Sequence, residues 1–319
     1  MTTIDSILTQ QIKSNRTPSL QYIVFTADKI LYQYANGFMD VKNEIKSNDK
    51  TTYAIYSVTK TFTALAVMQL AQQNMLNIEL PVKNYLPGFP YSSGITIKQL
   101  LSHTSGIPNP IPLRWTHLGE EHSTFNSDLF FKQIFYKKNK LKFEPGKKFA
   151  YSNLGYVLLG QLIEKVSGLQ YEDYIRKNIL TPLNIAPEEM DFIIQQPEQH
   201  AKGYHKKFSF SNLLLGLLIN KSKFTSAAEG KWIPFKNNYV NGTAYGGLIG
   251  TAGALVKYLQ SFLKSNNHLL NEEYKQLMFT ETLTSEKKLP ACVYPGLKAT
   301  WQAKNILLMQ VVVAVIIAK

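Results

Sequence analysis

The sequence predicts an α/β (α+β) protein that combines a small antiparallel sheet with a mostly helical middle region. Residues 22–26 and 30–34 are rich in aromatic and β-branched side chains, and the three residues between them indicate a hairpin. Residues 57–73 carry a broad apolar helical face, which is typical of a buried central helix. Helical periodicity then recurs through the middle of the chain. With 319 residues the chain can bury a sizeable core, as one large domain or two closely packed ones.

The composition indicates a globular protein without a nucleic-acid partner. The apolar fraction is 45% and the charged fraction is 18%, which are values of folded rather than disordered chains. The net charge of +13 is compatible with a polyanion partner, but the lysines are scattered except over residues 137–148. Because no zinc-finger spacing, aromatic RNA-binding motif or basic zipper accompanies them, a solvated basic face is expected.

The cysteine count, the histidine spacing and the apolar segments indicate where the protein is located and whether it binds a cofactor. The single cysteine, Cys292, excludes an intrachain disulfide framework. Residues 1–19 lack the apolar core of a signal peptide, so a cytoplasmic location is expected. The apolar run 306–318 is short for a membrane span, and no membrane partner is expected. The six histidines have no metal-ligand spacing, so neither a metal nor another cofactor is expected.

The N-terminal third is predicted as helix, hairpin and helix. Residues 3–13 carry apolar residues at helical spacing, and the hairpin follows them. Asn36-Gly37 is expected to end the second strand. The central helix is expected to open at Ser57 and run to about Gln73, with Asn74 as its C-terminal cap.

The middle of the chain is predicted to be mostly helical. Thr96 is placed to cap a short helix, and three further helices are expected over about 130–135, 154–167 and 171–179. Residues 208–219 are unusually apolar and are interpreted as a core or lid helix, with a membrane-touching segment as the alternative. The Gly-rich turn at 245–252 leads into a last helix, but it lacks dinucleotide or P-loop spacing and predicts no phosphate site.

The pair Ser57 and Lys60 is a candidate for nucleophilic catalysis. Three residues apart at a helix N-terminus, a hydroxyl and an amine would share one face, as in Ser-x-x-Lys hydrolases. Burial would keep the amine neutral and able to accept the serine proton. The same spacing occurs three more times in this Ser- and Lys-rich chain, so the spacing alone does not single out Ser57; these pairs are Ser47/Lys50, Ser261/Lys264 and Ser285/Lys288.

The segment Tyr151-Ser152-Asn153 offers the second proton-transfer group that an acyl-serine hydrolase needs. The Tyr151 phenol would relay a proton if a nearby lysine charge lowers its pKa, and the Asn153 amide would hold a substrate carbonyl. The competing interpretation is a surface serine, an exposed lysine and a tyrosine packed in a loop.

Four longer strings resemble the serine β-lactamase-related family, which includes class C β-lactamases, penicillin-binding D-alanyl-D-alanine peptidases and related esterases. They are residues 56–66, residues 100–107, residues 145–156 and residues 246–252, with Gly250 where the family usually has Ser. The strings follow the family's order and span about residues 20 to 265.

This resemblance implies a β-lactamase/transpeptidase-like fold with an antiparallel sheet built from both chain ends. The α/β domain would comprise residues 1–75 and 244–288, with a mostly helical insertion at 76–243. Ser57 would be the acylated nucleophile and would give half of the oxyanion hole through its backbone N–H. Lys60 and Tyr151 would share the base and acid roles in an order that the sequence leaves open, and Asn153 would bind substrate. His103 is expected to cap local backbone.

The C-terminal tail, residues 289–319, departs from the family. The family's Lys/His-Thr/Ala-Gly motif lies on a late edge strand beside the nucleophile and has no match after Ala252. We hypothesise that the tail is read in a shifted frame, because suitable codons for 291–297 and 308–319 also encode family-like strings in another frame. The alternative is a natural divergent tail. A gene with one intact frame between the codons for Ser285 and Ala291, ending at Lys319, would contradict the hypothesis.

Two functions follow from these observations. The first is a serine hydrolase that acylates Ser57 with an ester, amide or β-lactam carbonyl, with an esterase or peptidase role inside the cell as the more natural setting. The second is an inactive or non-catalytic binding remnant, because a broken frame would remove late sheet strands and half of the oxyanion hole. The substrate and the oligomeric state stay open.

Overall fold

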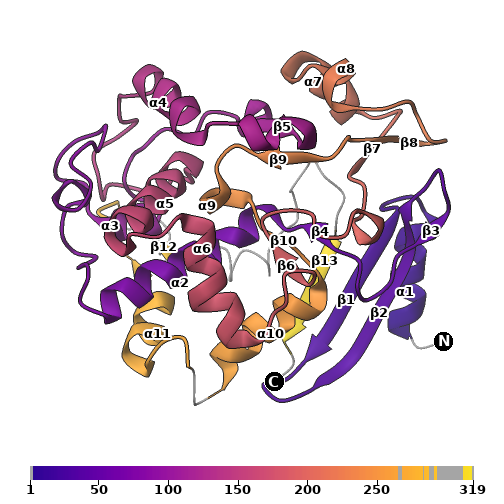
Figure 1. The fold of residues 1–319 in the computed structure, drawn as a ribbon, viewed down its shortest axis with the longest axis horizontal. Coiled ribbons are helices and arrows are strands. Elements are labelled where there is room, and N and C mark those ends of the chain that lie inside the picture. Colours follow the sequence, from indigo (N-terminus) through magenta and orange to yellow (C-terminus); the bar gives the residue numbers. More distant parts are fainter. Residues whose placement is uncertain (1–2, 265–267, 283, 287–290, 293–311, 318–319) are drawn as a thin grey trace.

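A sheet lies along one side of the molecule, and most of the helices fill the other side (Figure 1). The computed structural model describes residues 3–264, 268–282, 284–286, 291–292 and 312–317. The main sheet has the strand order β13-β1-β2-β3, and its strands come from both ends of the chain. Their bounds are β1 Ser19–Phe25, β2 Ile30–Asp40, β3 Ile45–Lys46 and β13 Val312–Ile317. The α/β fold class that the sequence predicts is thereby confirmed.

The predicted hairpin is present and the two faces of its sheet are covered by different helices. β1 and β2 pair antiparallel, with Tyr22 opposite Tyr34. The sheet face that carries the Tyr34 side chain is covered by α1 (Thr3–Lys13), whose Thr9 Oγ1 lies 3.0 Å from Tyr34 Oη. The other face presents Ile23, which joins a buried cluster with Val256 of α10 (Ala252–Leu263).

Two details of the sheet differ from the sequence prediction. β13 pairs with β1 in the parallel sense, so the antiparallel expectation holds for β1, β2 and β3 only. Asn36-Gly37 was also expected to end β2, but the strand continues to Asp40. Gly37 has φ +89°, and a Cβ there would lie 2.2 Å from the Pro18 carbonyl oxygen. The glycine therefore lets β2 pass close to the neighbouring chain instead of ending the strand.

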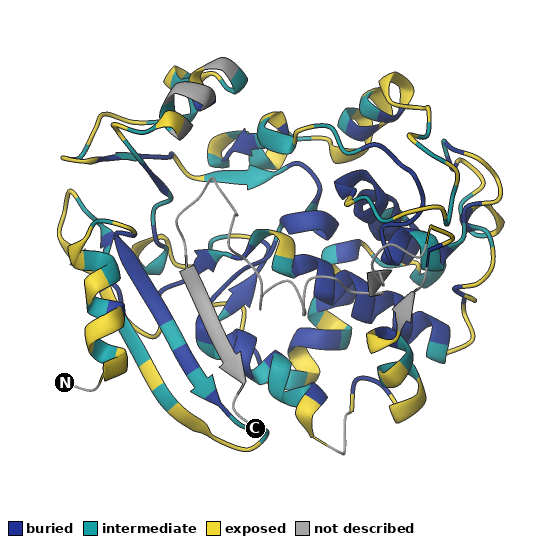
Figure 2. Ribbon diagram, turned by 180° about the vertical axis from the view of Figure 1, so that it is seen from behind, coloured by how far each residue is buried: buried dark blue, intermediate teal, exposed yellow. Residues whose placement is uncertain are grey.

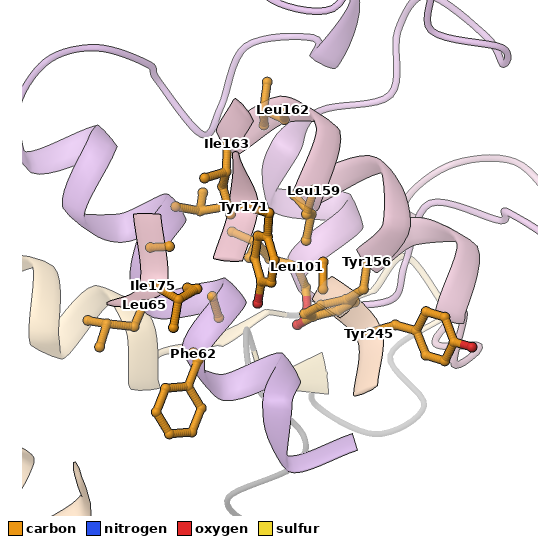
Figure 3. Close-up of a cluster of buried hydrophobic side chains, with 14 of the residues drawn as sticks. Phe62, Leu65, Leu101, Tyr156, Leu159, Leu162, Ile163, Tyr171, Ile175 and Tyr245 are labelled. Atoms are coloured by element: carbon orange, nitrogen blue, oxygen red, sulfur yellow. The ribbon is translucent and has the colours of Figure 1, made fainter. Parts of the chain in front are cut away.

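The central helix α2 (Thr59–Gln72) is buried along its length, as its sequence predicts; every residue from Thr59 to Ala71 is buried. Apolar side chains from α2 and α5 (Asn153–Ser167) meet in one core cluster (Figure 3). Phe62 stacks on Tyr258 of α10 with ring centroids 3.9 Å apart. Because α2 has neighbours on all sides, its first turn is held rigidly, as a catalytic position requires.

The helices predicted in the middle of the chain are confirmed. Thr96 caps the short α3 (Ile97–Leu101) in a capping box with Gln99. Gly168 takes a left-handed conformation and ends α5. The other helices have the bounds α4 Ser127–Lys137, α6 Tyr171–Ile175, α8 Lys221–Phe224, α9 Thr243–Gly246 and α11 Glu272–Phe279.

Several very short strand pairs were not predicted. β4 (Tyr53–Ala54), β10 (Ile249–Gly250) and β6 (Met190–Asp191) form a small sheet beside α2. The remaining pairs are β5 (Thr116–Leu118) with β9 (Asn238–Val240), β7 (Tyr204–Lys206) with β8 (Trp232–Pro234), and β11 (Glu281–Thr282) with β12 (Ala291–Cys292). Strands of two or three residues are too short to show an alternating pattern.

The apolar segment 208–219 is exposed at its N-terminal end. It forms α7 (Phe210–Leu218), which with α8 lies at one edge of the molecule (Figure 1). Leu215 is buried, but Phe208 is 86% exposed and Phe210 is 75% exposed. Figure 2 shows the same edge with exposed residues. The core interpretation of this segment is therefore wrong for Phe208 and Phe210.

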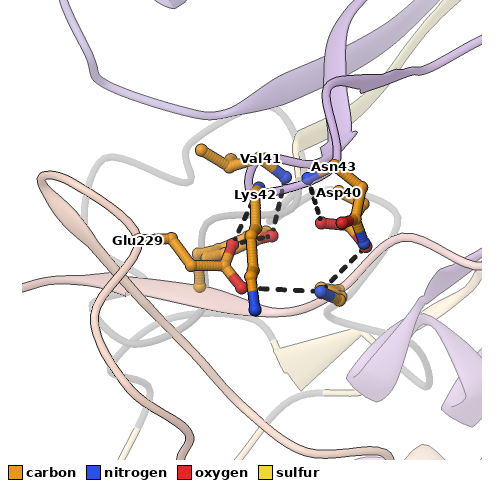
Figure 4. A network of polar contacts seen from close by, with 7 residues as sticks. Asp40, Val41, Lys42, Asn43 and Glu229 are labelled. Carbon is orange, nitrogen blue, oxygen red and sulfur yellow. Dashed lines mark hydrogen bonds and ion pairs between the residues drawn. The ribbon is translucent and has the colours of Figure 1, made fainter.

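A polar network ties the β7–β8 unit, which carries α7 and α8, to the end of β2 (Figure 4). Lys202 Nζ lies 2.8 Å from an oxygen of Asp40 and 3.5 Å from one of Glu229. Glu229 also accepts hydrogen bonds from the Tyr204 hydroxyl and the Lys42 backbone N–H. Donors from the β7–β8 unit and from the end of β2 thus satisfy these carboxylates. The network therefore fixes the β7–β8 unit on the sheet.

Most of the tail over 289–319 lies outside the described residues, and the shifted-frame hypothesis stays a prediction. Over the part of the chain that the structure describes, no helix has the length and apolarity needed to cross a membrane.

Candidate active site

Ser57 lies on a tight turn directly before the central helix. The turn is a single 3₁₀ turn, Tyr56–Val58, and α2 begins at Thr59, so Ser57 precedes the α-helix that it was expected to open. Tyr56 has φ +41°, which is a strained conformation for an aromatic residue. The turn leaves Ser57 exposed, whereas α2 is buried from Thr59 onward. Ser57 is therefore accessible to a substrate.

Lys60 lies beneath Ser57 on the first turn of α2. Its exposed fraction is only 2%. Lys60 Nζ lies 3.3 Å from Ser57 Oγ and donates to the Tyr245 carbonyl oxygen at 2.5 Å. Burial lowers the pKa of the Lys60 amine well below its usual value, because desolvation disfavours the charged form. A neutral amine next to a serine hydroxyl can accept its proton.

Three aromatic rings surround the Lys60 amine. Their centroids lie 5.0 Å (Tyr151), 5.5 Å (Tyr156) and 5.4 Å (Tyr245) from Nζ. Ring faces attract an ammonium group, so they stabilise a transient charge on Lys60. Burial thus favours the neutral Lys60 amine, and the aromatic rings stabilise its protonated form when that form is transiently present.

Tyr151 reaches the same hydroxyl from a distant part of the chain. It lies just before α5, and its Oη donates to Ser57 Oγ at 2.9 Å. Burial of much of the ring raises the pKa of Tyr151 to about 12, although the Ser57 hydrogen bond acts in the opposite direction. The expectation that lysine charge lowers this pKa is therefore wrong. With a raised pKa the phenol is protonated at neutral pH and can donate.

Asn153 lies at the start of α5, two residues after Tyr151, and is buried. Its backbone N–H donates to Asn109 Oδ1 at 3.0 Å, and its Nδ2 donates to the same oxygen at 3.2 Å. Asn109 belongs to the Pro-rich loop after residue 107. Because one acceptor takes both donors, the Asn153 amide is fixed in orientation. Asn109 was not predicted, and the sequence contains no signal for it.

His103 joins two of the family-like strings. It has φ +57° and is buried, and its Nδ1 accepts the Ser152 backbone N–H at 3.1 Å. Its ring centroid lies 4.5 Å from that of Tyr151. Burial, with a smaller effect of Lys60, lowers the pKa of His103 to about 3. The neutral imidazole holds backbone, as expected, but it is the backbone of the remote Ser152 and not that of its own turn.

The Gly-rich string packs against the nucleophile turn. The Ile55 N–H donates to the Leu248 carbonyl, and the Leu248 N–H donates to Thr59 Oγ1. A Cβ at Gly246 would lie 3.5 Å from the Tyr56 carbonyl carbon. The segment therefore supports the Ser57 turn from outside α2. Tyr245, whose carbonyl accepts from Lys60, belongs to this segment and was also not predicted as a site residue.

Two of the other Ser-x-x-Lys pairs lie wholly within the described residues, and their serines bond elsewhere. The Ser47 hydroxyl lies 2.7 Å from the Tyr53 hydroxyl, and the Ser261 hydroxyl donates to the Tyr258 carbonyl. The third pair includes Lys288, which lies outside the described residues. Of the described pairs, Ser57 and Lys60 form a direct serine–lysine contact. The structure thus brings Ser57, Lys60 and Tyr151 together, with Asn153 two residues from Tyr151.

Comparison with known proteins places the chain among relatives of one family. The family model described as Beta-lactamase matches residues 4–306. The chain is 31% identical over 208 residues to Protein flp of Staphylococcus aureus (strain MRSA252), which covers 63% of this chain and 40% of that protein. It is 35% identical over 153 residues to a penicillin-binding protein of Bacillus subtilis (strain 168), with coverages of 48% and 34%. The chain thus spans well under half of the length of these relatives.

A solved structure has the same fold over most of the chain. The octameric penicillin-binding protein homologue from Pyrococcus abyssi superposes with a TM-score of 0.71 at 26% identity. The superposition covers 91% of this chain and 63% of that one.

Proposed function

Because this chain belongs to the Beta-lactamase family, we propose that it is a serine hydrolase that forms an acyl intermediate on Ser57. The observation that carries the proposal is the convergence of Lys60 Nζ and Tyr151 Oη on Ser57 Oγ, at 3.3 and 2.9 Å. A buried amine with a lowered pKa and a phenol with a raised pKa are matched as base and acid.

In acylation, Ser57 Oγ attacks the substrate carbonyl carbon and its proton passes to the neutral Lys60 amine. The bond to the leaving alcohol or amine then breaks, and Tyr151 gives its hydroxyl proton to that group. Lys60 as ammonium and Tyr151 as phenolate remain as an opposite-charge pair, which lowers the cost of both charges in a dry site. The pKa directions of the two residues support this order, which the sequence left open.

In deacylation, the roles reverse. Water attacks the acyl carbon and loses a proton to the Tyr151 phenolate, and the Lys60 ammonium returns its proton to Ser57 Oγ as the ester bond breaks. Each group regains its starting state, so no further proton source is needed.

Two groups bind the substrate at its reacting carbonyl. The Ser57 backbone N–H, directly before α2, forms one half of the oxyanion hole, where the helix dipole favours negative charge. Asn153 binds the substrate with its side-chain amide, which Asn109 holds in place. The substrate class is a carbonyl compound with a leaving group: an ester, an amide or a β-lactam.

The second candidate is a non-catalytic binding protein of the same fold. The observation that favours it is the lack of a Lys/His-Thr/Ala-Gly motif after Ala252, since the second oxyanion donor belongs to that motif's strand. Loss of one such donor typically costs about 10²–10³ in rate. A remnant of this kind would still bind a substrate-like ligand near Asn153.

Covalent labelling separates the two candidates. We expect a fluorophosphonate to label the wild-type protein and not Ser57→Ala, and a nitrophenyl ester or chromogenic β-lactam to be hydrolysed only by the wild type. Ser261→Ala, which removes the serine of another Ser-x-x-Lys pair, is the matched control and should react like the wild type. Labelling that survives Ser57→Ala would contradict the first candidate. A folded wild-type protein that is not labelled would favour the second.

A further inference from the structure

The α7–α8 hairpin, defined here as residues 206–224, exposes aromatic side chains at its N-terminal end. Phe208 is 86% exposed and Phe210 is 75% exposed, which are among the highest values of the large apolar residues described. The sequence of α7 contains no charged residue. Two neighbouring exposed phenylalanines at the start of an apolar helix indicate a contact surface rather than incidental exposure.

Lysines surround this aromatic end. Residues 201–236 contain seven lysines and a single acidic residue, Glu229, which is already paired with Lys202. Lys207, Lys231 and Lys236 are exposed, and no carboxylate among the described residues forms an ion pair with them. The local charge is therefore positive and open to a partner.

Backbone hydrogen bonds place Lys231 and Lys236 next to the hairpin, which itself contains Lys207. The Lys207 N–H donates to the Lys231 carbonyl, and the Lys236 N–H donates to the Phe224 carbonyl at the end of α8. Lys207 Nζ lies 5.4 Å from the centre of the Phe208 ring. Basic and aromatic groups thus form one patch instead of two separate surfaces.

The hairpin is held in its outward position by contacts at its base. Arg114 Nε donates to the Leu218 carbonyl at 2.7 Å, and Lys223 Nζ lies 2.6 Å from Glu121. Lys221 Nζ donates to Asn212 Oδ1 at 2.6 Å and links α8 to α7. The exposed end is therefore presented by a fixed support, unlike a loosely tethered loop.

We propose that the α7–α8 hairpin docks on an anionic lipid surface, with Phe208 and Phe210 inserted among the headgroups and the lysines on lipid phosphates. Phenylalanine rings enter the interfacial region favourably, and each basic residue near an anionic surface adds attraction. A second copy of the chain is the weaker occupant, because two such patches facing each other would bring their lysines together. This inference is independent of the function proposed for Ser57.

The test uses the whole protein and vesicles of phosphatidylcholine with and without phosphatidylglycerol. Co-sedimentation at low salt should show binding to the phosphatidylglycerol vesicles and much weaker binding to pure phosphatidylcholine. The double variant Phe208→Ser, Phe210→Ser should lower the partition coefficient by about tenfold or more. The double variant Lys207→Glu, Lys231→Glu should lower it by at least about thirtyfold at low salt and by less at high salt.

Matched controls come from α4, on another part of the surface. Tyr136 is 82% exposed and is followed by the exposed Lys137, so Tyr136→Ser and Lys137→Glu change the same kinds of group elsewhere. Both should bind vesicles within about twofold of the wild type. The variant Phe208→Trp adds a direct readout, since its emission should shift to the blue only with phosphatidylglycerol vesicles.

Three results would overturn the proposal. One is a wild-type protein that does not bind the anionic vesicles. Another is equal loss of binding in the α4 controls and the hairpin variants. The third is concentration-dependent self-association that is lost in the double phenylalanine variant, since a second copy would then cover the patch.

Discussion

Lys60 Nζ lies 3.3 Å from Ser57 Oγ, although Lys60 is 2% exposed and the Ser57 side chain is open to solvent. The pair therefore spans the boundary between the core and the surface. Desolvation acts on the amine, while the hydroxyl stays accessible to a carbonyl compound. The 3₁₀ turn before α2 therefore supplies an accessible nucleophile, and the first turn of α2 supplies a desolvated base.

The first prediction concerns the pH dependence of activity. Because the pKa of Lys60 is lowered, the amine becomes neutral well below the usual lysine range, so kcat/KM should rise with pH on the acid side and level off. On the alkaline side, activity should fall only as pH approaches about 12, the pKa of Tyr151. Initial rates with a nitrophenyl ester, corrected for spontaneous hydrolysis, measure the profile. An optimum confined to acidic pH would contradict Lys60 as base.

The second prediction concerns the stability cost of Lys60. Between its lowered folded pKa and the ordinary value of 10.5, the unfolded chain binds a proton that the folded chain does not, so stability should rise with pH. The slope from one such group is at most about 1.4 kcal/mol per pH unit. Lys60→Met should remove this contribution and lower activity by about 10²–10⁴-fold. Urea unfolding at several pH values compares the two proteins; parallel pH curves would exclude the effect.

The third prediction isolates the phenol of Tyr151. Tyr151→Phe keeps the ring beside Lys60 and removes only the hydroxyl that donates to Ser57 Oγ. Since the residue is 37% exposed, the melting temperature should change little, whereas kcat should fall by about 10²–10³-fold. Thermal unfolding and steady-state kinetics are measured together. A variant with normal kcat would remove Tyr151 from the mechanism.

The fourth prediction tests Asn109 as the positioning residue for Asn153. Asn109→Ala removes the oxygen that accepts both Asn153 donors, so kcat/KM for an amide or ester should fall by about tenfold. Asn109→Asp retains an acceptor and should recover part of the loss. Fluorophosphonate labelling of Ser57 should persist in both variants. Equal kinetics for Asn109→Ala and the wild type would contradict the role.

The fifth prediction concerns His103 in acid. Its folded pKa is about 3, against 6.5 for the free side chain, so the unfolded chain binds the extra proton between these values. Stability should therefore fall as pH decreases from about 6.5 to about 3, and this part of the decline should be absent in His103→Gln. His103→Ala, which also leaves the Ser152 N–H without its acceptor, should cost about 2–4 kcal/mol at neutral pH. Calorimetry over this pH range tests both statements.

Much of the fold was predictable from local pattern. The hairpin of β1 and β2, the buried α2 and the helix that ends at Gly168 all follow from periodicity and capping residues, which act within a few positions of the chain. The two- and three-residue strands were not predictable, because their pairing partners are remote in sequence. β10, for example, lies between β4 and β6.

The sequence also could not predict that Phe208 and Phe210 are exposed. An apolar helix has the same pattern whether it fills a core or projects from it, so Phe208 and Phe210 read as core candidates. Only the packing of the β7–β8 unit against the end of β2 decided which residues solvent reaches.

The sequence by itself determined the family strings and the candidates Ser57, Lys60, Tyr151 and Asn153. The tertiary structure decided which of these groups meet, because Tyr151 is 94 positions from Ser57 and no local rule relates them. It also decided the opposite pKa directions of Lys60 and Tyr151. A pKa depends on desolvation and on neighbours brought together by folding, and neither is a property of sequence spacing.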